Sequence, residues 1–264
     1  MLSVVITAHH DDKACYLTAF AVKAQLERAN LEHEIIVVSD GGAETKWANQ
    51  KVRGLGVNTG SPQLTRDAGI RASKFPNVLV VESHVIVSDI EMLLARHLGH
   101  GAALTFPMRR AEGTEMFDVY GHETDWNGNL WHKRLIYQRV SEWPYRVAQF
   151  GHSCFILDRG WYLSSGGYTT LMRGWGGEEP FLCLKAWMLG RECWMVPSVW
   201  HAHYLTSGGP DRTATADFVL NMDILAYVIA GRRRPGRDLG PAVEAERQRI
   251  CAGPFGGDVN LLRA

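Results

Sequence analysis

The sequence has no long hydrophobic run and no excess of charge of either sign. Its 264 residues carry 28 Lys and Arg against 28 Asp and Glu, so the formal net charge is zero. This balance argues against a protein that coats nucleic acid through bulk charge. No apolar run approaches the roughly 20 residues of a transmembrane helix, which predicts a chain without a membrane span.

Closely spaced cysteines are also lacking. The five cysteines are far apart, and none is part of a CxxC pair. The odd count and the spacing favour reduced, buried thiols in a cytoplasmic protein. The opening MLSVVITAHHDD has an apolar stretch too short for a signal peptide and no basic segment before it. These features together predict a cytoplasmic protein.

The first half of the chain alternates short apolar segments with amphipathic ones. Apolar runs rich in β-branched residues predict buried strands at Leu2–Ala8, Glu34–Val38, Val78–Val81 and Leu104–Phe106. Helical spacing predicts helices at Tyr16–Arg28, Pro62–Ser73 and Asp89–Leu98. Repeated strand–helix–strand units of this kind predict an α/β fold, with a mainly parallel sheet and helices on both faces.

Polar clusters follow three of these predicted strands, at residues 9–12, 39–42 and 82–84. Ligands of such sheets bind outside the carboxyl ends of the strands. We therefore expect the three clusters to converge on one rim.

The second half of the chain has a different pattern. Residues 107–150 are polar and aromatic, and residues 150–205 alternate short strands with glycine turns. Helices are expected at about Glu179–Leu189 and at 214–230. Arginines at 232–234 and 237 precede a glycine-rich tail.

Three short motifs carry residues suited to chemistry. Glu82-Ser83-His84 follows a buried strand, and His201-Ala202-His203 follows the apolar segment Trp194–Pro197. Mixed oxygen and nitrogen ligands suit an ion such as Mn²⁺. Gly174-Trp175-Gly176-Gly177-Glu178-Glu179 brings two carboxylates to a helix start, where one can orient or deprotonate a hydroxyl. Taken singly, each motif also fits a plainer role: a polar loop, packed histidines, or glutamates that cap a helix.

In this order the motifs resemble those of GT-A-fold glycosyltransferases, close to family 2 and to the catalytic domain of polypeptide N-acetylgalactosaminyltransferases. SVVITAHHDD resembles the family's first strand, and VVSDGG its nucleotide turn. TRDAGIRASKFPNVLVVESH resembles the stretch that leads into the metal motif, and Glu82-Ser83-His84 stands in place of DxD or DxH. GWGGEEPFLCLKAW and PSVWHAHY resemble the later motifs, with His203 as the last histidine. The resemblance covers roughly residues 1–210.

The resemblance implies a metal-dependent transfer of sugar from a nucleotide-diphosphate donor, most simply a UDP-sugar, to an acceptor hydroxyl. It implies Mn²⁺ or Mg²⁺ at Glu82, His84 and His203, and catalytic carboxylates at Glu178 and Glu179. Donor-binding positions carried over from the family are Thr7, Ala8, His9, Asp40, Arg66, Gly69, Ser83, Trp175, Gly176 and Gly177.

The same resemblance suggests how the chain is divided. Residues 1–106 correspond to a nucleotide-sugar-binding half, residues 107–213 to an acceptor-binding and catalytic half of the same domain, and residues 214–264 to a C-terminal helix with a basic, glycine-rich tail. The glycine pair after His203 predicts a lid at residues 204–213, with an ordinary surface turn as the alternative.

Two departures from the family bear on mechanism. Glu82 replaces an aspartate, and Glu179 stands where many inverting enzymes carry a catalytic aspartate. A retaining outcome is favoured, and inversion stays open. The acceptor is a glycan, a protein, or a hydroxymethylated base of phage DNA, the last because the arginines at 232–234 and 237 can contact phosphates.

Two other function classes compete with this interpretation. AHHDD resembles the AHPDD motif of zinc-dependent N-acetylglucosaminyl deacetylases, in which His9 and Asp12 would bind zinc together with a later His-x-x-H such as His97/His100. The proline and the following glutamate of that motif are missing. A non-catalytic nucleotide-sugar-binding module is the other alternative, and it would not need two carboxylates at a helix start.

Overall fold

The structure is a computed structural model. It describes residues 1–9, 12–41, 52–100, 103–105, 108–112, 115–119, 122–125, 132–135, 141–151, 153–204, 216–232, 236 and 238–254. For residues 9, 12, 13, 97–100, 204 and the described parts of 103–135, only the backbone is considered.

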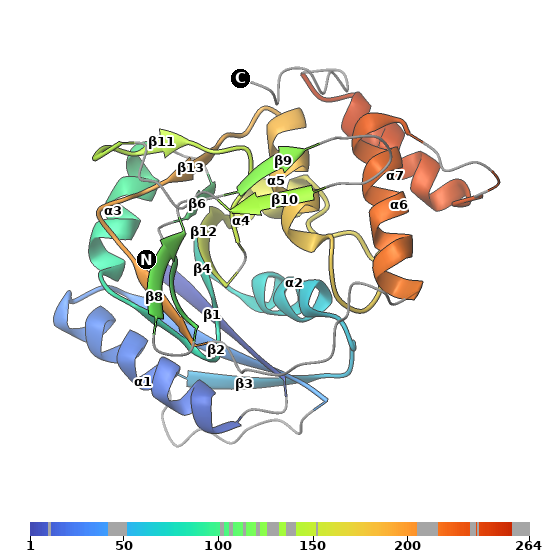
Figure 1. The fold of residues 1–264 in the computed structure, drawn as a ribbon. Coiled ribbons are helices and arrows are strands. Elements are labelled where there is room, and N and C mark those ends of the chain that lie inside the picture. The colour runs from blue at the N-terminus through green and yellow to red at the C-terminus, as the bar shows by residue number, and fades with distance from the viewer. Residues whose placement is uncertain are drawn as a thin grey trace.

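A sheet of eight strands runs through the molecule in the order β11-β13-β6-β12-β4-β1-β2-β3 (Figure 1). Its parallel block consists of β1 (Leu2–His9), β2 (His33–Asp40), β3 (Val52–Val57) and β4 (Asn77–Glu82). Valine and isoleucine fill both faces of the three inner strands, which is typical of parallel strands covered by helices on each side. The mainly parallel sheet expected from the sequence is confirmed.

The other half of the sheet is mixed in direction. Strand β12 (Cys154–Asp158) runs antiparallel to both β4 and β6 (Ala103–Thr105). Beyond them, β13 (Cys193–Met195) is parallel to β6, and β11 (Tyr145–Arg146) is antiparallel to β13. The antiparallel strand therefore lies directly beside the parallel block that carries the predicted site.

Helices cover both faces of the sheet. On one face α1 (Asp12–Arg28) and α3 (Ile90–His100) pack over side chains such as Val4, Ile6 and Leu79. On the other face α2 (Pro62–Ala72), α4 (Arg159–Ser164) and α5 (Glu178–Met188) pack over a second cluster that includes Val5 and Val38. Side chains alternate between faces along a strand, so odd positions of β1 and even positions of β2 and β4 face α2.

A smaller sheet has the order β5-β14-β7-β8 and joins the end of β4 to a distant segment. Its strands are β5 (Val85–Val87), β14 (His201–Tyr204), β7 (Met108–Glu112) and β8 (Glu115–Val119). Strand β14 is antiparallel to β5, with His203 opposite Val85. Two further strands, β9 (His122–Asp125) and β10 (His132–Leu135), form a separate antiparallel pair.

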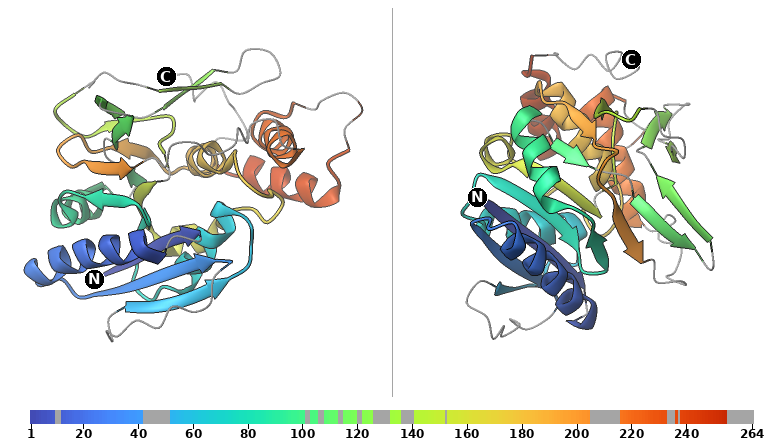
Figure 2. Two further views of the ribbon diagram at one scale, coloured as in Figure 1. Left: turned by 60° about the horizontal axis from the view of Figure 1, so that its bottom comes forward. Right: turned by 90° about the vertical axis from the view of Figure 1, so that its left-hand side faces the viewer.

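The C-terminal helices α6 (Ala216–Ala230) and α7 (Pro241–Cys251) pack on α5 around a third apolar cluster. In both views of Figure 2 they lie at the end of the molecule away from α1. Helix α6 confirms the prediction for 214–230. Helix α7 lies where the sequence analysis expects only a tail; it begins with Pro241, whose missing N–H is no loss at the first position of a helix. No helix among the described residues is long and apolar enough to cross a membrane.

Candidate metal and nucleotide-sugar site

The carboxyl ends of β1, β2 and β4 meet at one rim, as expected from the polar clusters that follow these strands. The strand register places His9 opposite Asp40, and Thr7 opposite Glu82. Thr7, Asp40 and Glu82 have the same strand parity as the core residues beneath α2, so all three face the α2 side of the sheet. Of these clusters, His10, Asp11 and Gly42 lie outside the described residues.

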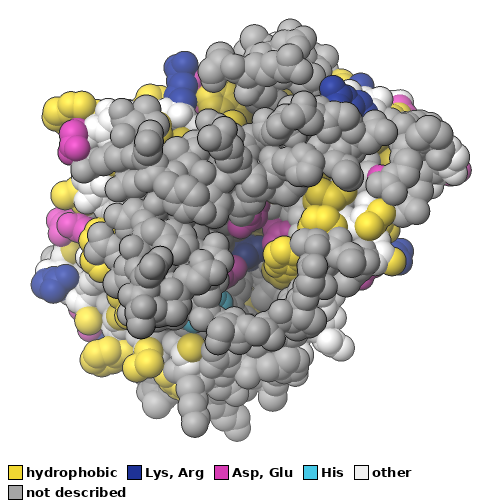
Figure 3. All heavy atoms as spheres, viewed as in Figure 1, with side chains coloured by type: hydrophobic (Ala, Val, Ile, Leu, Met, Phe, Trp, Pro, Cys, Tyr) yellow, Lys and Arg dark blue, Asp and Glu magenta, His cyan; other side chains and the backbone are white. Residues whose placement is uncertain are grey.

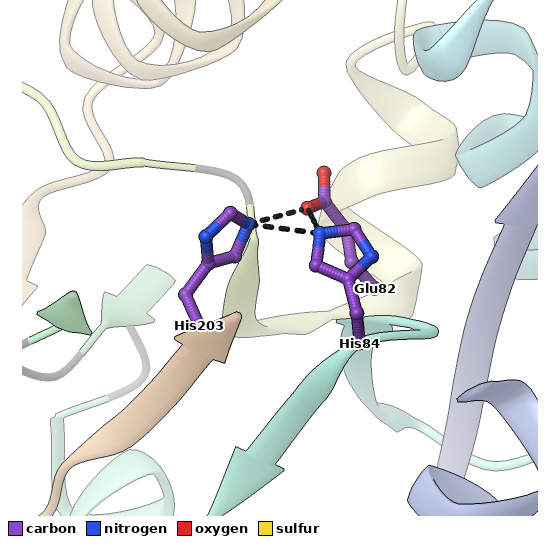
Figure 4. A group of neighbouring side chains, drawn as sticks. All are labelled: Glu82, His84 and His203. Carbon is purple, nitrogen blue, oxygen red and sulfur yellow. Dashed lines mark hydrogen bonds and ion pairs between the residues drawn. The ribbon is translucent and has the colours of Figure 1, made fainter. Parts of the chain in front are cut away.

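Glu82, His84 and His203 come together at this rim (Figure 4). Glu82 Oε2 lies 3.1 Å from His203 Nε2 and 3.4 Å from His84 Nε2, and the two Nε2 atoms are 3.1 Å apart. Glu82 ends β4, His84 lies in the turn before β5, and His203 lies on β14. The pairing of β14 with β5 therefore brings His203 beside His84 from more than a hundred residues away in the sequence.

These three atoms fit a divalent cation. Ligands about 2.0–2.2 Å from one ion and at right angles to each other are roughly 3 Å apart, which is close to the observed separations. One carboxylate oxygen and two imidazole nitrogens form a mixed donor set of the kind that suits Mn²⁺. Within the described part of the chain, this is the group of histidine, cysteine and acidic side chains whose ligand atoms converge in this way.

Arg66 of α2 holds the carboxylate in position from the other side. Its Nη2 donates to Glu82 Oε1 at 2.6 Å, which leaves Oε2 facing the histidines. Burial disfavours ionisation of Glu82, but hydrogen bonds from His203 and His84 and the charge of Arg66 hold its pKa well below the ordinary value. Glu82 therefore stays a carboxylate, the form that binds cations.

Arg66 also faces a second carboxylate. It is almost completely buried, and its Nη1 lies 3.7 Å from Glu178 Oε1. Burial works to lower the pKa of Arg66, but the charges of Glu82 and Glu178 outweigh it and raise that pKa. The buried guanidinium of Arg66 thus links the cluster of Glu82, His84 and His203 to the glycine-rich loop before α5. Figure 3 shows basic, acidic and histidine side chains near one another in a hollow on this face of the molecule.

The glycine-rich loop has a conformation that requires glycine. Gly174, Gly176 and Gly177 have φ values of 55°, 102° and 85°. A Cβ on Gly176 would lie 2.4 Å from the ring of Phe218 in α6, so the backbone is also pressed against its neighbour. Glu178 Oε2 accepts from the N–H of Gly176 at 2.9 Å, and burial raises the pKa of Glu178 while Arg66 opposes that shift. Glu178 therefore stabilises the loop that precedes it.

Asn221 of α6 fixes the same loop and was not foreseen from the sequence. Its fully buried amide donates to the carbonyls of Arg173 and Gly176 at 2.7 Å and 2.8 Å, and its Oδ1 accepts from Arg173 N at 2.9 Å. An asparagine inside the apolar segment ADFVLNMDILAYVIA is the signal that could have indicated it. Trp175, which this loop presents, is 40% exposed and stacks on Phe218.

Thr18 is a second positioning residue that the sequence analysis missed. Its hydroxyl group contacts the carbonyls of Ser83 and Val85 at 2.6 Å and 3.1 Å, which ties α1 to the turn that carries His84. Ser83 itself is buried, and its N–H donates to the carbonyl of Thr7. A threonine in an amphipathic helix gives no sequence signal of this role.

Asp40 organises the turn that leads into α2. Its carboxylate accepts from the N–H and hydroxyl of Thr59 at 2.7 Å and 3.0 Å, and from Gly60 N at 3.3 Å. Although burial opposes ionisation, these hydrogen bonds lower the pKa of Asp40 below its ordinary value. The predicted nucleotide-binding aspartate thus also determines where α2 begins.

The remaining predicted site residues fall into three groups. Thr7 is half-buried at the rim, and Ala8 is buried on the α1 face of the sheet. Gly69 requires a correction, because it does not face the rim. A Cβ at Gly69 would lie 2.3 Å from Val5 Cγ1 and 2.8 Å from Val38 Cγ2, so this glycine allows α2 to pack closely on the sheet. The side chains of His9, Asp12, His97 and His100 and the predicted lid beyond Tyr204 lie outside the described residues.

Sequence comparison finds relatives of this chain among curated proteins. No protein-family model matches the chain. A Drosophila melanogaster protein assigned as polypeptide N-acetylgalactosaminyltransferase 13 is 26% identical over 223 residues, covering 74% of this chain and 40% of its own length. Polypeptide N-acetylgalactosaminyltransferase 16 of Mus musculus is 24% identical over 221 residues, covering 74% and 38%. The chain thus spans about two fifths of the curated relatives it matches.

Solved structures agree with these relatives. The crystal structure of GalNAc-T7 with UDP, GalNAc and Mn²⁺ superposes with a TM-score of 0.73 at 15% identity, over 100% of this chain and 57% of that one. Staphylococcus aureus TarS 1–349 with UDP-GlcNAc superposes with a TM-score of 0.62 at 15% identity, over 96% and 71%. The chain has the GT-A glycosyltransferase fold. It resembles the catalytic domains of polypeptide N-acetylgalactosaminyltransferases, and the deacetylase alternative is not favoured.

Proposed function

We propose that this GT-A chain is a metal-dependent glycosyltransferase that moves a sugar from a UDP-sugar to an acceptor hydroxyl group. The observation that carries the proposal is the convergence of Glu82, His84 and His203 beside the buried Arg66 at the rim of the parallel strands. The names of the relatives and the UDP bound in GalNAc-T7 support the donor class.

Each part of the site has a role in this proposal. Glu82, His84 and His203 would hold Mn²⁺ or Mg²⁺, and the ion would supply Lewis-acid stabilisation of negative charge on the diphosphate leaving group. Arg66 adds positive charge at the same place. Thr7, His9 and Asp40 line the nucleoside, and Ser83 and the backbone of Gly176 and Gly177 border the donor. Trp175 borders the transferred sugar.

The two glutamates at the start of α5 divide their work. Glu178 is buried, accepts from Gly176 N and faces Arg66, so it positions the loop and the arginine. Glu179 is only half-buried and is the carboxylate we assign to the acceptor hydroxyl. A retaining outcome stays favoured over inversion, and the acceptor is a glycan, a protein or a modified DNA base.

The test measures Mn²⁺-dependent binding of UDP by isothermal titration calorimetry and by the shift in thermal unfolding temperature. We expect His84→Ala and His203→Ala to weaken UDP binding in Mn²⁺ by at least the roughly 10- to 100-fold that follows loss of a residue that only supports a metal ligand. Leu17→Ala, at a 71% exposed position of α1, is the control and leaves binding unchanged. Unaltered UDP binding and donor turnover in both histidine variants would contradict the proposal.

A further inference from the structure

The amide of Gln63, near the start of α2, has no hydrogen-bond partner although it is completely buried. Its side chain is 0% exposed, and neither Oε1 nor Nε2 is bonded to any group. A buried, unpaired polar group destabilises a protein, so native proteins rarely keep one without a reason. Glutamine is also a residue that is usually exposed. The Gln63 amide is therefore a candidate contact for a polar ligand.

Its neighbours on α2 have the same property. Ser61 Oγ, at the N-cap, and Arg66 Nε are buried and unpartnered too. Gln63 and Arg66 are three residues apart and so lie on the same side of the helix. The unsatisfied groups of Gln63 and Arg66 thus form a row along one side of α2, and this row leads to the guanidinium that faces Glu82.

The geometry of the fold places this row over the carboxyl end of β1. Ile70, seven residues after Gln63 and on the same side of α2, packs in the core with Val5 and Val38. Helix α2 runs back from the end of β3 to the start of β4, so moving from Ile70 to Gln63 leads about 10 Å toward the strand ends. That is the length of about three strand residues, which reaches from Val5 to Ala8. Gln63 thus belongs to the region of Thr7 and Asp40.

We infer that Gln63 recognises the base of the donor nucleotide, an inference that rests on the proposed function. A carboxamide presents a donor and an acceptor in one plane. The imide edge of uracil, with N3–H beside a carbonyl oxygen, satisfies both groups with two parallel hydrogen bonds. A ribose hydroxyl group or a phosphate oxygen satisfies them less completely. Because the amide is fully buried, a nucleotide must displace the groups that cover it in order to reach it.

The contrast with Gln25 provides a matched control. Gln25 lies on α1, and its amide donates to the carbonyl of Val87 at 2.6 Å and accepts from Ile90 N at 3.2 Å. Replacement by methionine, which has a similar shape without polar groups, removes satisfied hydrogen bonds at Gln25 but only unsatisfied groups at Gln63. The ligand-free Gln63→Met variant should therefore unfold at the same temperature as the unaltered chain or a higher one, whereas Gln25→Met should unfold at a lower temperature.

The decisive experiment measures binding of UDP and of N3-methyl-UDP, each with Mn²⁺, to the unaltered chain and both variants. We expect Gln63→Met to lose about 10- to 100-fold in affinity for UDP, the effect of losing paired hydrogen bonds in a buried site. The methylated nucleotide should bind to the unaltered chain more weakly than UDP does. The Gln63→Met variant should bind the two nucleotides with about equal affinity. Gln25→Met should keep the discrimination between the two nucleotides.

Three results overturn the inference. Unchanged UDP affinity in Gln63→Met, with Mn²⁺-dependent binding intact, removes the role of Gln63 and leaves the proposed function standing. Equal losses for UDP and N3-methyl-UDP show that the amide contacts ribose or diphosphate and not the base. A lowered unfolding temperature of ligand-free Gln63→Met shows a structural role. Failure of the unaltered chain to bind UDP at all refutes the proposed function itself.

Discussion

Arg66 is the residue on which the charges of the site depend. It is buried between Glu82, which stays ionised, and Glu178, whose pKa is raised mainly by burial. A single buried guanidinium faces two carboxylates, and it lies nearer to Glu82 than to Glu178. The negative charge of Glu178 is therefore only partly neutralised. Loss of one member of a buried ionic group is costly because it leaves the others unpaired. The two glutamates should therefore respond differently to substitution.

We predict that Glu178→Gln stabilises the protein at pH 8 and slows the reaction. The native state of the unaltered chain binds a proton at Glu178 more tightly than the unfolded state does, so ionisation above the raised pKa reduces stability. This cost is present at pH 8 and disappears as the pH falls below the ordinary value of 4.5. The glutamine keeps an oxygen for Gly176 N but loses the charge that faces Arg66. Arg66 is then less firmly positioned, and donor turnover should fall by about 100-fold.

Urea unfolding at pH 8 and pH 4 checks the stability part of this prediction. The gain of Glu178→Gln over the unaltered chain should be larger at pH 8. Leu17→Ala, at a 71% exposed position of α1, is the control: it removes no titratable group and should show no such difference between the two pH values. The quantity to compare is the free energy of unfolding of Glu178→Gln minus that of the unaltered chain. If this difference is smaller at pH 8 than at pH 4, Glu178 is not a carboxylate that burial destabilises.

At the scale of elements, the close packing of α2 on the sheet sets the position of Arg66 and Gln63. Gly69 permits this packing, since a Cβ there would meet Val5 and Val38 at 2.3 Å and 2.8 Å. We predict that Gly69→Ala destabilises the fold by about 1–3 kcal/mol, the usual cost of overpacking, even though alanine is the better helix former. It should also weaken UDP binding, because α2 must move away from the strand ends.

Two variants test whether the lost space is the cause. Val5→Ala combined with Gly69→Ala should recover part of the stability lost in Gly69→Ala, and the deviation from additivity measures the clash. Gly160→Ala in α4, where the nearest atom would lie 3.3 Å away, should have little effect on unfolding or on UDP binding. Purely additive losses at Val5 and Gly69 would show that the close contact does not limit the packing of α2.

The elements also show what the sequence could and could not predict. Strands β1, β2 and β4 were predictable because runs of valine and isoleucine end at polar turns. Strand β3, with the sequence VRGLGV, was not, because two glycines weaken its strand signal. The direction of β12 was not predictable either, because a short apolar run carries no information about which way its neighbour runs.

The site was predictable in its residue types and less so in its contacts. Glu82, His84 and His203 follow predicted strands, so the expected rim brought them together. Asn221 bonds to Arg173, 48 residues away, and Thr18 bonds to the carbonyl of Ser83, 65 residues away. Such contacts depend on how helices pack on the sheet, and periodicity along the chain does not encode that packing.

At the scale of the whole molecule, α5 joins the two sides of the core. It contributes Leu182, Cys183 and Ala186 to the cluster on the sheet, and Phe181, Leu184 and Met188 to the cluster around α6 and α7. Its Lys185 is fully buried, donates to the carbonyl of Gly167 at 2.6 Å and pairs with Glu246 of α7 at 3.2 Å. Burial lowers the pKa of this lysine to about 8. The glycine-rich loop of the site leads directly into this helix.

We therefore predict that the sheet and the C-terminal helices unfold together, although the sequence suggests a separate segment from residue 214. Ile250 of α7 is completely buried in the C-terminal cluster, and Ile6 of β1 is completely buried at the opposite end of the core. Replacement of either isoleucine by alanine should cost about 2–5 kcal/mol. If α5 couples the clusters, each variant shifts one urea transition, seen at the same midpoint by far-ultraviolet circular dichroism and by tryptophan fluorescence. If Ile250→Ala instead produces an early transition of its own while the remaining transition keeps its midpoint, the helices after residue 214 are an independent unit, and the loop that carries Glu178 does not depend on them.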